Sequence, residues 1–246
     1  MSDRRPSFFQ QSRAFVLSVA PILAMFFFAR VALAEAYRIP SGSMEPTMLV
    51  GDWLWVNKLR YGPHIPFTNI NLPGYAEPKR GEVAVFISPP QDPAIRIAPD
   101  IVTPLLVKRI VGVAGDTLAM RDGRLFVNGV AESRDSVLNT MVRDDYVHPI
   151  FAWQQQIAVA QTSIGAPVAT PSVHNWGPLV VPSGHFFMLG DNRDNSVDSR
   201  FYGPVPRANV RGRPTFVYYS YDTERGASLV RALTEIRWSR LGTWIR

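Results

Sequence analysis

The stretch LLVKRIVGVAGD, residues 105–116, is the most informative segment for the fold. Its first nine residues are almost all apolar and rich in β-branched side chains, which is typical of a strand. Because alternate residues of a strand share a face, Lys108 is predicted to point the same way as Leu106 and Ile110, and Arg109 the opposite way. The segment therefore predicts a β-rich domain with a lysine set into an apolar strand.

A lysine in this setting is predicted to be partly buried. Burial disfavours its charged form, and the neighbouring Arg109 is expected to add like-charge repulsion. An ordinary lysine has a pKa of about 10.4, which must fall by roughly three units before the amine can act as a base at neutral pH. Arginine keeps its proton, and only three of the 26 basic residues are lysines (Lys58, Lys79 and Lys108). The alternative is an edge-strand Lys108 that faces water.

Upstream of this strand lies IPSGSMEPTM, residues 39–48. Two serines, Ser41 and Ser43, flank a glycine, and prolines bracket the group. Glycine permits unusual backbone conformations and proline fixes φ, so the segment could hold a hydroxyl in an exposed, strained position. The alternative is an ordinary polar loop.

Downstream lies GDNRDNSVDSR, residues 190–200, after the apolar run HFFML (185–189). Its alternating acidic, basic and amide side chains predict a dense hydrogen-bonded network. A calcium loop is an alternative, although the closing Glu of an EF-hand is missing and the arginines oppose a cation. A plain solvated loop is the other alternative.

The remaining strand signals are short apolar runs at 83–87, 105–113 and 216–219. Asp122-Gly123 lies between the runs 117–120 and 125–127 and predicts a two-residue hairpin turn, and Asn128-Gly129 predicts a second tight turn. Residues 131–180 carry no chemical motif and are expected to form an insertion or small subdomain.

The N-terminal region predicts a membrane anchor. Residues 1–13 are polar and basic and are expected to stay in the cytoplasm, whereas 14–34 are apolar apart from Arg30. At about 1.5 Å per residue, these 21 residues reach about 31 Å, close to the thickness of a bilayer core. Residues 35–246 would then lie outside the cytoplasm. A cleaved signal peptide ending at Ala32-Leu33-Ala34 is the alternative, and it also exports the domain.

Composition excludes several kinds of chemistry. The chain has no cysteine, so thiol catalysis, disulfides and thiolate metal sites are excluded. Its four histidines are scattered and form no zinc motif, and no metal or other cofactor is expected. The net charge is +6, but the sequence contains no basic run with interleaved aromatics. Nucleic acid is therefore not an expected partner.

Five segments together resemble the signature boxes of bacterial type I signal peptidases, in the order found in that family and behind an N-terminal anchor. They are IPSGSMEPT (39–47), GDWLWVNK (51–58), KRGEVAVF (79–86), VKRIVGVAGD (107–116) and GDNRDNSVDSR (190–200). The resemblance implies a mainly β fold, with a coiled, partly open antiparallel barrel and a smaller β extension that contains 131–180. It implies a bacterial inner-membrane protein with its catalytic domain on the periplasmic side. Some relatives carry two anchor helices, whereas the sequence of this chain predicts one.

The resemblance also implies roles for individual residues. Ser43 takes the place of the nucleophile and Lys108 that of the general base. Ser41 matches a hydroxyl of the oxyanion hole, and Ser196 matches one that orients the lysine. Four further residues match those that brace the site: Asp191, Arg193, Asp198 and Arg200.

The implied substrate is the signal peptide of an exported preprotein, with small residues at positions −1 and −3. The positions that match the lining of these two subsites are Ile39, Met44, Met48, Leu54, Leu106 and Val107. Two other hypotheses stay open. The chain could be a processing peptidase dedicated to one secretion system, or a membrane-anchored binding protein without activity.

The C-terminal segment LTEIRWSRLGTWIR, residues 233–246, combines Trp238 and Trp244 with arginines. This composition suits a membrane interface, where the lipid bilayer would be a second partner. The alternative is that both tryptophans pack on the β domain.

Overall fold

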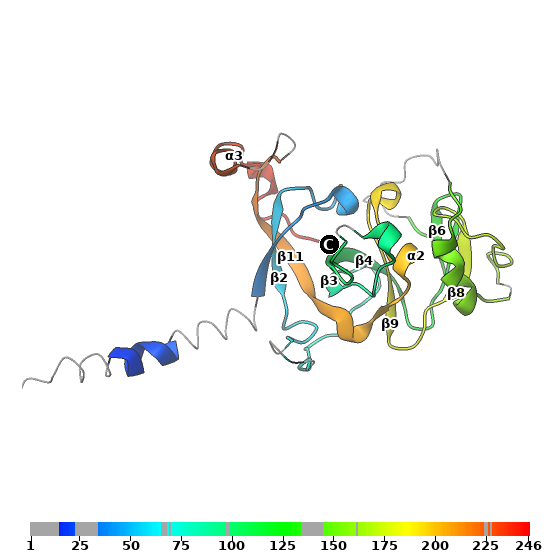
Figure 1. Ribbon diagram of the computed structural model, residues 1–246, viewed down its shortest axis with the longest axis horizontal. Coiled ribbons are helices and arrows are strands. Elements are labelled where there is room, and N and C mark those ends of the chain that lie inside the picture. Colours follow the sequence, from blue (N-terminus) through cyan, green and yellow to red (C-terminus); the bar gives the residue numbers. More distant parts are fainter. Residues whose placement is uncertain are drawn as a thin grey trace, which may run out of the picture.

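The computed structural model describes residues 15–22, 34–64, 68, 70–96, 99–133, 145–160, 162–223, 226 and 228–246. Within these ranges the protein is mainly β, as predicted. Two antiparallel sheets lie side by side, with short helices in their connections (Figure 1).

The larger sheet has seven strands in the order β1-β2-β11-β3-β4-β9-β10. Their bounds are β1 Ala34–Arg38, β2 Asp52–Asn57, β3 Val83–Ile87, β4 Leu105–Val113, β9 His185–Leu189, β10 Val205–Pro206 and β11 Val210–Ser220. The predicted strands at 83–87 and 105–113 have these bounds, and the run 216–219 is part of β11.

The long strand β11 curls this sheet. Its first residues pair with β3 and the rest pair with β2, with register shifts after Val210, Pro214 and Val217. Such irregularities bend a strand and increase its twist. In Figure 1, β11 accordingly runs between β2 and β3. The β1–β2 pair and the β3–β4–β9 group are therefore joined in the sheet through β11 alone, among the described strands.

The smaller sheet has the order β7-β6-β5-β8. Its strands are β5 Thr117–Arg121, β6 Arg124–Val127, β7 Val130–Ala131 and β8 Trp176–Val180. Asp122 and Asn128 have φ of 48° and 51°, and each precedes a glycine that also has positive φ. Both predicted tight turns are confirmed.

The helices are short. They are η1 Gly42–Met44, η2 Pro93–Ile95, η3 Pro149–Ile157, η4 Arg193–Asn195, α2 Ser199–Tyr202, η5 Arg207–Asn209, α3 Leu229–Thr234 and η6 Trp238–Arg240. Residues 15–22 are also helical. The rest of the predicted anchor lies outside the described residues, except Ala34, which opens β1. No helix within the described ranges has the length and apolarity to span a membrane.

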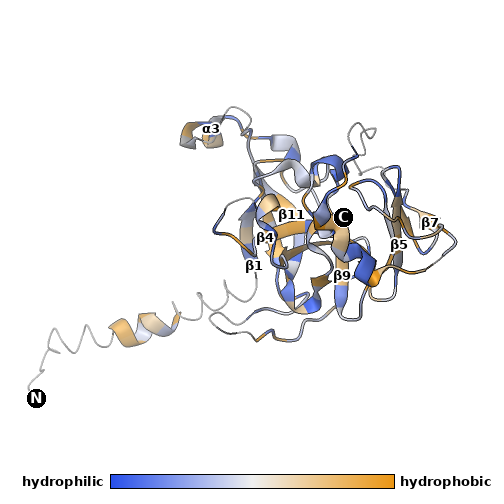
Figure 2. Cartoon of the chain, turned by 45° about the vertical axis from the view of Figure 1, so that its right-hand side comes forward, coloured by the Kyte–Doolittle hydropathy of each residue, from blue (hydrophilic) through white to orange (hydrophobic). Residues whose placement is uncertain are grey.

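Three apolar clusters form most of the core. The first contains Met48, Leu54 and Val217 inside the curl of β1, β2 and β11. The second joins β4 and β9 to the smaller sheet through Trp176 and Phe187, whose rings stack 5.3 Å apart. The third lies on the opposite side of β3, β4 and β9. Figure 2 shows much of β4 as hydrophobic, because this strand contributes to the interior. Lys108 is itself buried, in the strand β4 that contributes to the second and third clusters.

Candidate active site

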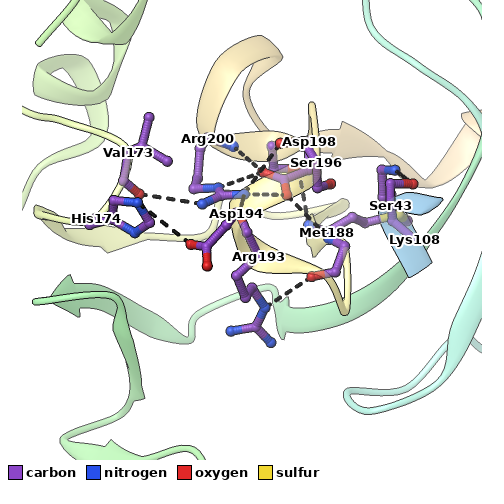
Figure 3. A network of polar contacts seen from close by, with 12 residues as sticks. Ser43, Lys108, Val173, His174, Met188, Arg193, Asp194, Ser196, Asp198 and Arg200 are labelled. Carbon is purple, nitrogen blue, oxygen red and sulfur yellow. Dashed lines mark hydrogen bonds and ion pairs between the residues drawn. The ribbon is translucent and has the colours of Figure 1, made fainter. Parts of the chain in front are cut away.

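Ser43 and Lys108 face each other at hydrogen-bond distance. Ser43 lies in η1, between β1 and β2, and Lys108 lies in β4. Lys108 Nζ is 2.5 Å from Ser43 Oγ, and the two side chains point toward each other (Figure 3). Relative exposure is 9% for Ser43 and 3% for Lys108. Two residues far apart in sequence therefore form one buried polar pair.

Lys108 does not face water as the alternative required, because its side chain is buried. β4 lies between β3 and β9, and Lys108 pairs with Ala84 of β3. Burial lowers the pKa of Lys108 from its ordinary value to about 8, although Asp198 and Asp191 pull it upward. The charge of Arg200 adds to the lowering. A substantial fraction of the amine is therefore neutral near pH 8.

Arg109 does not repel Lys108 as expected. Its side chain lies on the other face of β4 and forms a buried, bidentate pair with Asp191, with Nε–Oδ1 at 2.7 Å and Nη2–Oδ2 at 2.5 Å. Thr47 donates a further hydrogen bond to the Asp191 carboxylate. The expectation was wrong because Asp191 neutralises Arg109, and the like charge that lowers the pKa of Lys108 is Arg200.

The loop 190–200 forms the predicted network. Arg200 binds the Asp198 carboxylate through two nitrogens, at 2.8 and 2.9 Å, and both residues are fully buried. Burial alone would raise the pKa of Asp198, but the charge and hydrogen bonds of Arg200 outweigh it and the pKa is lowered. Arg193 donates to the backbone carbonyl of Gly190 and to Glu132, next to β7. The loop is therefore held by hydrogen bonds and ion pairs and is not a plain solvated loop.

This loop also contacts the segment that carries Ser43. The backbone N–H of Asn192 donates to the carbonyl of Ser43, and its side chain donates to the carbonyl of Gly42. A Cβ on Gly190 would lie 2.5 Å from the Ser43 carbonyl oxygen and 2.3 Å from Ser196 Oγ. The loop and η1 can approach this closely only because residue 190 has no side chain.

Ser196 and Ser41 lie near the pair without bonding to it. Ser196 Oγ is buried and has no hydrogen-bond partner among the described residues. Ser41 is exposed at the start of η1. Both serines line a hollow that also contains Ser43 and Lys108. The structure therefore brings all four predicted residues together, but Ser196 is not bonded to the lysine.

Two hollows meet at the Ser43–Lys108 pair. The apolar hollow, of about 300 Å³, lies between residues 37–44 and the first half of β4, with Val85 in its wall. The polar hollow, of about 320 Å³, lies on the side of the 190–200 loop. Four residues line both: Ser41, Ser43, Leu106 and Lys108.

Four of the six predicted substrate-binding residues line the apolar hollow: Ile39, Met44, Leu106 and Val107. Met48 and Leu54 do not line it, because they are fully buried in the cluster behind Ile39 and Met44.

Sequence reasoning missed several lining residues. Tyr37, Val85 and Leu105 adjoin or lie within the quoted motifs, so the alternation of their strands could have suggested them. Gln91 and Tyr146 of the polar hollow lie outside every motif, and no sequence signal points to them.

Comparisons with known proteins point to one family. The model of the family described as "Signal peptidase, peptidase S26" matches residues 12–219. The chain is 32% identical over 225 residues to "Signal peptidase I" of Pseudomonas aeruginosa, covering 86% of this chain and 74% of that protein. It is also 32% identical over 229 residues to "Signal peptidase I" of Aquifex aeolicus, covering 81% of each. A crystal structure of a signal peptidase I from Enterococcus faecalis V583 aligns with 56% of this chain and 96% of that chain, at 27% identity and a TM-score of 0.34, too low to compare the two folds.

Proposed function

Since the chain belongs to the peptidase S26 family of signal peptidases, its reaction is the removal of signal peptides, and we propose that Ser43 and Lys108 carry out that reaction. The observation that supports this most is the 2.5 Å approach of Lys108 Nζ to Ser43 Oγ in a buried setting. A serine needs a base to become a nucleophile, and a neutral lysine can serve.

The proposed mechanism is a two-step acyl transfer. Neutral Lys108 takes the Ser43 proton as the hydroxyl attacks the scissile carbonyl, and then protonates the leaving amine. The acyl-enzyme on Ser43 is hydrolysed by water. We assign the oxyanion to the Ser41 hydroxyl and the backbone N–H of Ser43, and one such donor is typically worth about 3 kcal/mol.

The apolar hollow is the proposed site of the signal-peptide side of the substrate. β9 pairs with β4 only from Arg109 onward in the described register, so the edge of residues 105–108 on that side is open to an extended peptide. Residues −1 and −3 of an extended peptide face the same way, and here they would face Ile39, Met44 and Val107. We assign the preference for small residues at these two positions to the large side chains around the hollow.

The test of the dyad is cleavage of a preprotein by the detergent-solubilised chain, followed by N-terminal sequencing of the product. Ser43→Ala and Lys108→Ala are expected to abolish cleavage while the melting temperature shows a folded protein. Lys108→Arg should also be inactive, because arginine does not release its proton. A tenth of the activity remaining in Lys108→Ala would contradict the role of the base. Inactive wild-type protein would favour a binding role.

We also propose that residues 14–34 anchor the chain in the bacterial inner membrane, with residues 1–13 in the cytoplasm and 35–246 on the periplasmic side. The support is the apolar N-terminal sequence, of which 15–22 are helical. A phosphatase fused after Arg246 should be active outside the cytoplasm. A mature N-terminus at Glu35 would instead indicate a cleaved leader. In vivo depletion tests whether the chain is a general signal peptidase or one dedicated to a single secretion system. Depletion of a general enzyme should stop export broadly, and depletion of a dedicated enzyme should not.

A further inference from the structure

The polar hollow has no role in the mechanism given above. It shares Ser43 and Lys108 with the apolar hollow and continues from them along the 190–200 loop. A peptide bond attacked by Ser43 has chain on both sides of the cut. Because the apolar hollow is assigned to the signal-peptide side, the polar hollow is the space for the first residues of the mature chain.

Much of the wall of the polar hollow is apolar, in spite of its serines. Leu106 of β4 contributes to this wall together with Val197 and Phe201, and Tyr146 contributes from the insertion. The rings of Tyr146 and Phe201 both pack on Phe151, with centroids 6.0 and 5.2 Å away. In apolar surroundings a hydrogen bond is stronger than in water, and a polar group without a partner is more costly.

Gln91 places an amide in this wall. The residue is 3% exposed and lines the polar hollow, and its Oε1 has no hydrogen-bond partner among the described residues. Its main chain is fixed, because its N–H donates to the carbonyl of Val102 and its own carbonyl accepts from Arg96. The side-chain amide carries a donor and an acceptor, and a half-turn about its last bond exchanges them. Gln91 therefore holds a hydrogen-bonding group ready beside the dyad.

We propose that the side-chain amide of Gln91 binds the peptide group between residues +1 and +2 of the substrate, the first peptide group beyond the bond that is cut. A peptide group offers an N–H and a carbonyl, which complement an amide, and every substrate has one at this place. Gln91 is thus a substrate-binding residue that holds the mature chain while Lys108 protonates the leaving amine. The inference rests on the proposed dyad and on the assignment of the apolar hollow.

The experiment uses the full chain in detergent at pH 8 and two peptides that differ in one backbone group. An ester oxygen replaces the N–H between residues +1 and +2, which removes the donor and weakens the carbonyl as an acceptor. The wild type should cleave the amide peptide with a kcat/KM about tenfold higher than that of the ester peptide. A peptide with its ester between residues +4 and +5 is the substrate control and should be cleaved like the amide peptide.

Gln91→Leu should cleave the amide peptide about tenfold more slowly than the wild type, and it should cleave both peptides at similar rates. Its melting temperature should be equal or higher, because the change removes a buried acceptor that has no partner within the described protein. A purely structural role of Gln91 would instead lower the melting temperature. Gln91→Asn withdraws the same amide by a methylene group and should also lower the amide-to-ester ratio.

Gln154→Leu is the matched control. Gln154 is 1% exposed and its Oε1 is also without a partner among the described residues, but it lines neither hollow. Its Nε2 donates to the carbonyl of Arg200, so the variant should lose stability and keep the wild-type amide-to-ester ratio.

A ratio near one in the wild type would overturn the proposal, even if the Gln91 variants failed to fold. So would a wild-type ratio that persists in Gln91→Leu or in Gln91→Asn, because Gln91 would then fill the wall without binding the substrate. Cleavage of the amide peptide, and its loss in Ser43→Ala, tests the dyad separately. Failure of the Gln91 contact and failure of the proposed function are therefore distinguishable.

Discussion

Lys108 has an environment that favours the neutral form of a side chain that is normally protonated. Burial costs the ammonium form its hydration, and Arg200 adds to that cost while Asp198 and Asp191 oppose it. The result is a pKa of about 8. At this value much of the amine is neutral near the working pH, and the amine is still basic enough to accept a proton.

The pH dependence of cleavage follows from this value. As the proposed base, Lys108 can accept a proton only when it is neutral, and its pKa is lowered to about 8. We expect kcat/KM to rise about tenfold per pH unit below pH 8 and to level off above it. Rates on a fluorogenic peptide between pH 6 and pH 10 measure this. A midpoint above pH 10, typical of an exposed lysine, would contradict the proposed environment.

Gly190 is the second residue on which the site depends. A methyl group there would lie far inside contact distance of both Ser43 O and Ser196 Oγ. Gly190→Ala should therefore separate the loop from η1, lower kcat/KM by about 10²-fold and cost about 1–3 kcal/mol of unfolding free energy. Peptide cleavage and thermal melts measure the two effects.

Gly115→Ala is a suitable control for Gly190→Ala. Residue 115 has φ of +86°, but a Cβ there meets nothing within 4 Å. This variant should lose stability through backbone strain and keep its kcat/KM. If both variants lost activity in proportion to their stability, the close approach at Gly190 would not be specific to catalysis.

At the scale of single residues, the sequence indicated which residues belong to the candidate site better than it indicated which of them contact each other. The placement of Lys108 within an apolar run predicted partial burial, with an exposed edge-strand lysine as the alternative, and the side chain is 3% exposed. The partner of Arg109 was not predictable, because Asp191 lies in a distant loop and only the β4–β9 pairing brings the two together. Tyr146 and Asp194 line the same hollow although they are far apart in the sequence, and no local sequence pattern predicts that they meet.

The elements differ in how strongly local sequence determines them. The β5–β6–β7 meander follows from two dipeptides with positive φ, and it was predicted from them. The curl of the larger sheet follows from three register shifts in β11, of which two adjoin Gly212 and Pro214, while the third, after Val217, has no such marker in the sequence. These shifts depend on pairing with two strands that lie far away in the chain.

The link between β4 and the loop after β9 is the Arg109–Asp191 pair. Both side chains are buried, so removing the carboxylate leaves a buried cation without its counterion. Asp191→Asn should lower the unfolding free energy by about 3–5 kcal/mol and reduce cleavage as well, because Lys108 neighbours Arg109. Denaturant unfolding in detergent measures the first effect.

The exposed pair Arg207–Glu77 provides the comparison for this prediction. The side chain of Glu77 is 76% exposed, so Glu77→Gln should change stability by less than about 1 kcal/mol. A similar small change in Asp191→Asn would mean that the buried pair does not hold β4 to the loop.

On the scale of the whole molecule, the C-terminal segment 233–246 is anchored to the β domain, but its two tryptophans are exposed to solvent. Ile245 is buried in the core cluster, and Arg240 binds Asp52. Trp238 and Trp244 are 73% and 69% exposed. The alternative that both rings pack away on the β domain is therefore wrong for most of their surface, although Trp244 contacts Phe216 at 5.8 Å between ring centroids.

This arrangement supports the hypothesis that the segment docks on the lipid surface. Trp238→Ala combined with Trp244→Ala should slow cleavage of a preprotein in anionic liposomes and leave cleavage of a soluble peptide in detergent near the wild-type rate. Tyr75→Ala, another exposed aromatic, is the control. Equal liposome rates in the double variant and the wild type would reject docking.

The position of β11 in the larger sheet also governs when catalytic power arises. Ser43 follows β1 and Lys108 lies in β4, and β11 separates their two halves of the sheet. A nascent chain that has emerged only to residue 209 already contains both residues, but it lacks the strand that joins the two halves. Pairings between such distant segments form late and slowly. We therefore expect a chain that ends before Val210 to be inactive, because it lacks the strand that joins the half of the sheet next to Ser43 to the half that carries Lys108.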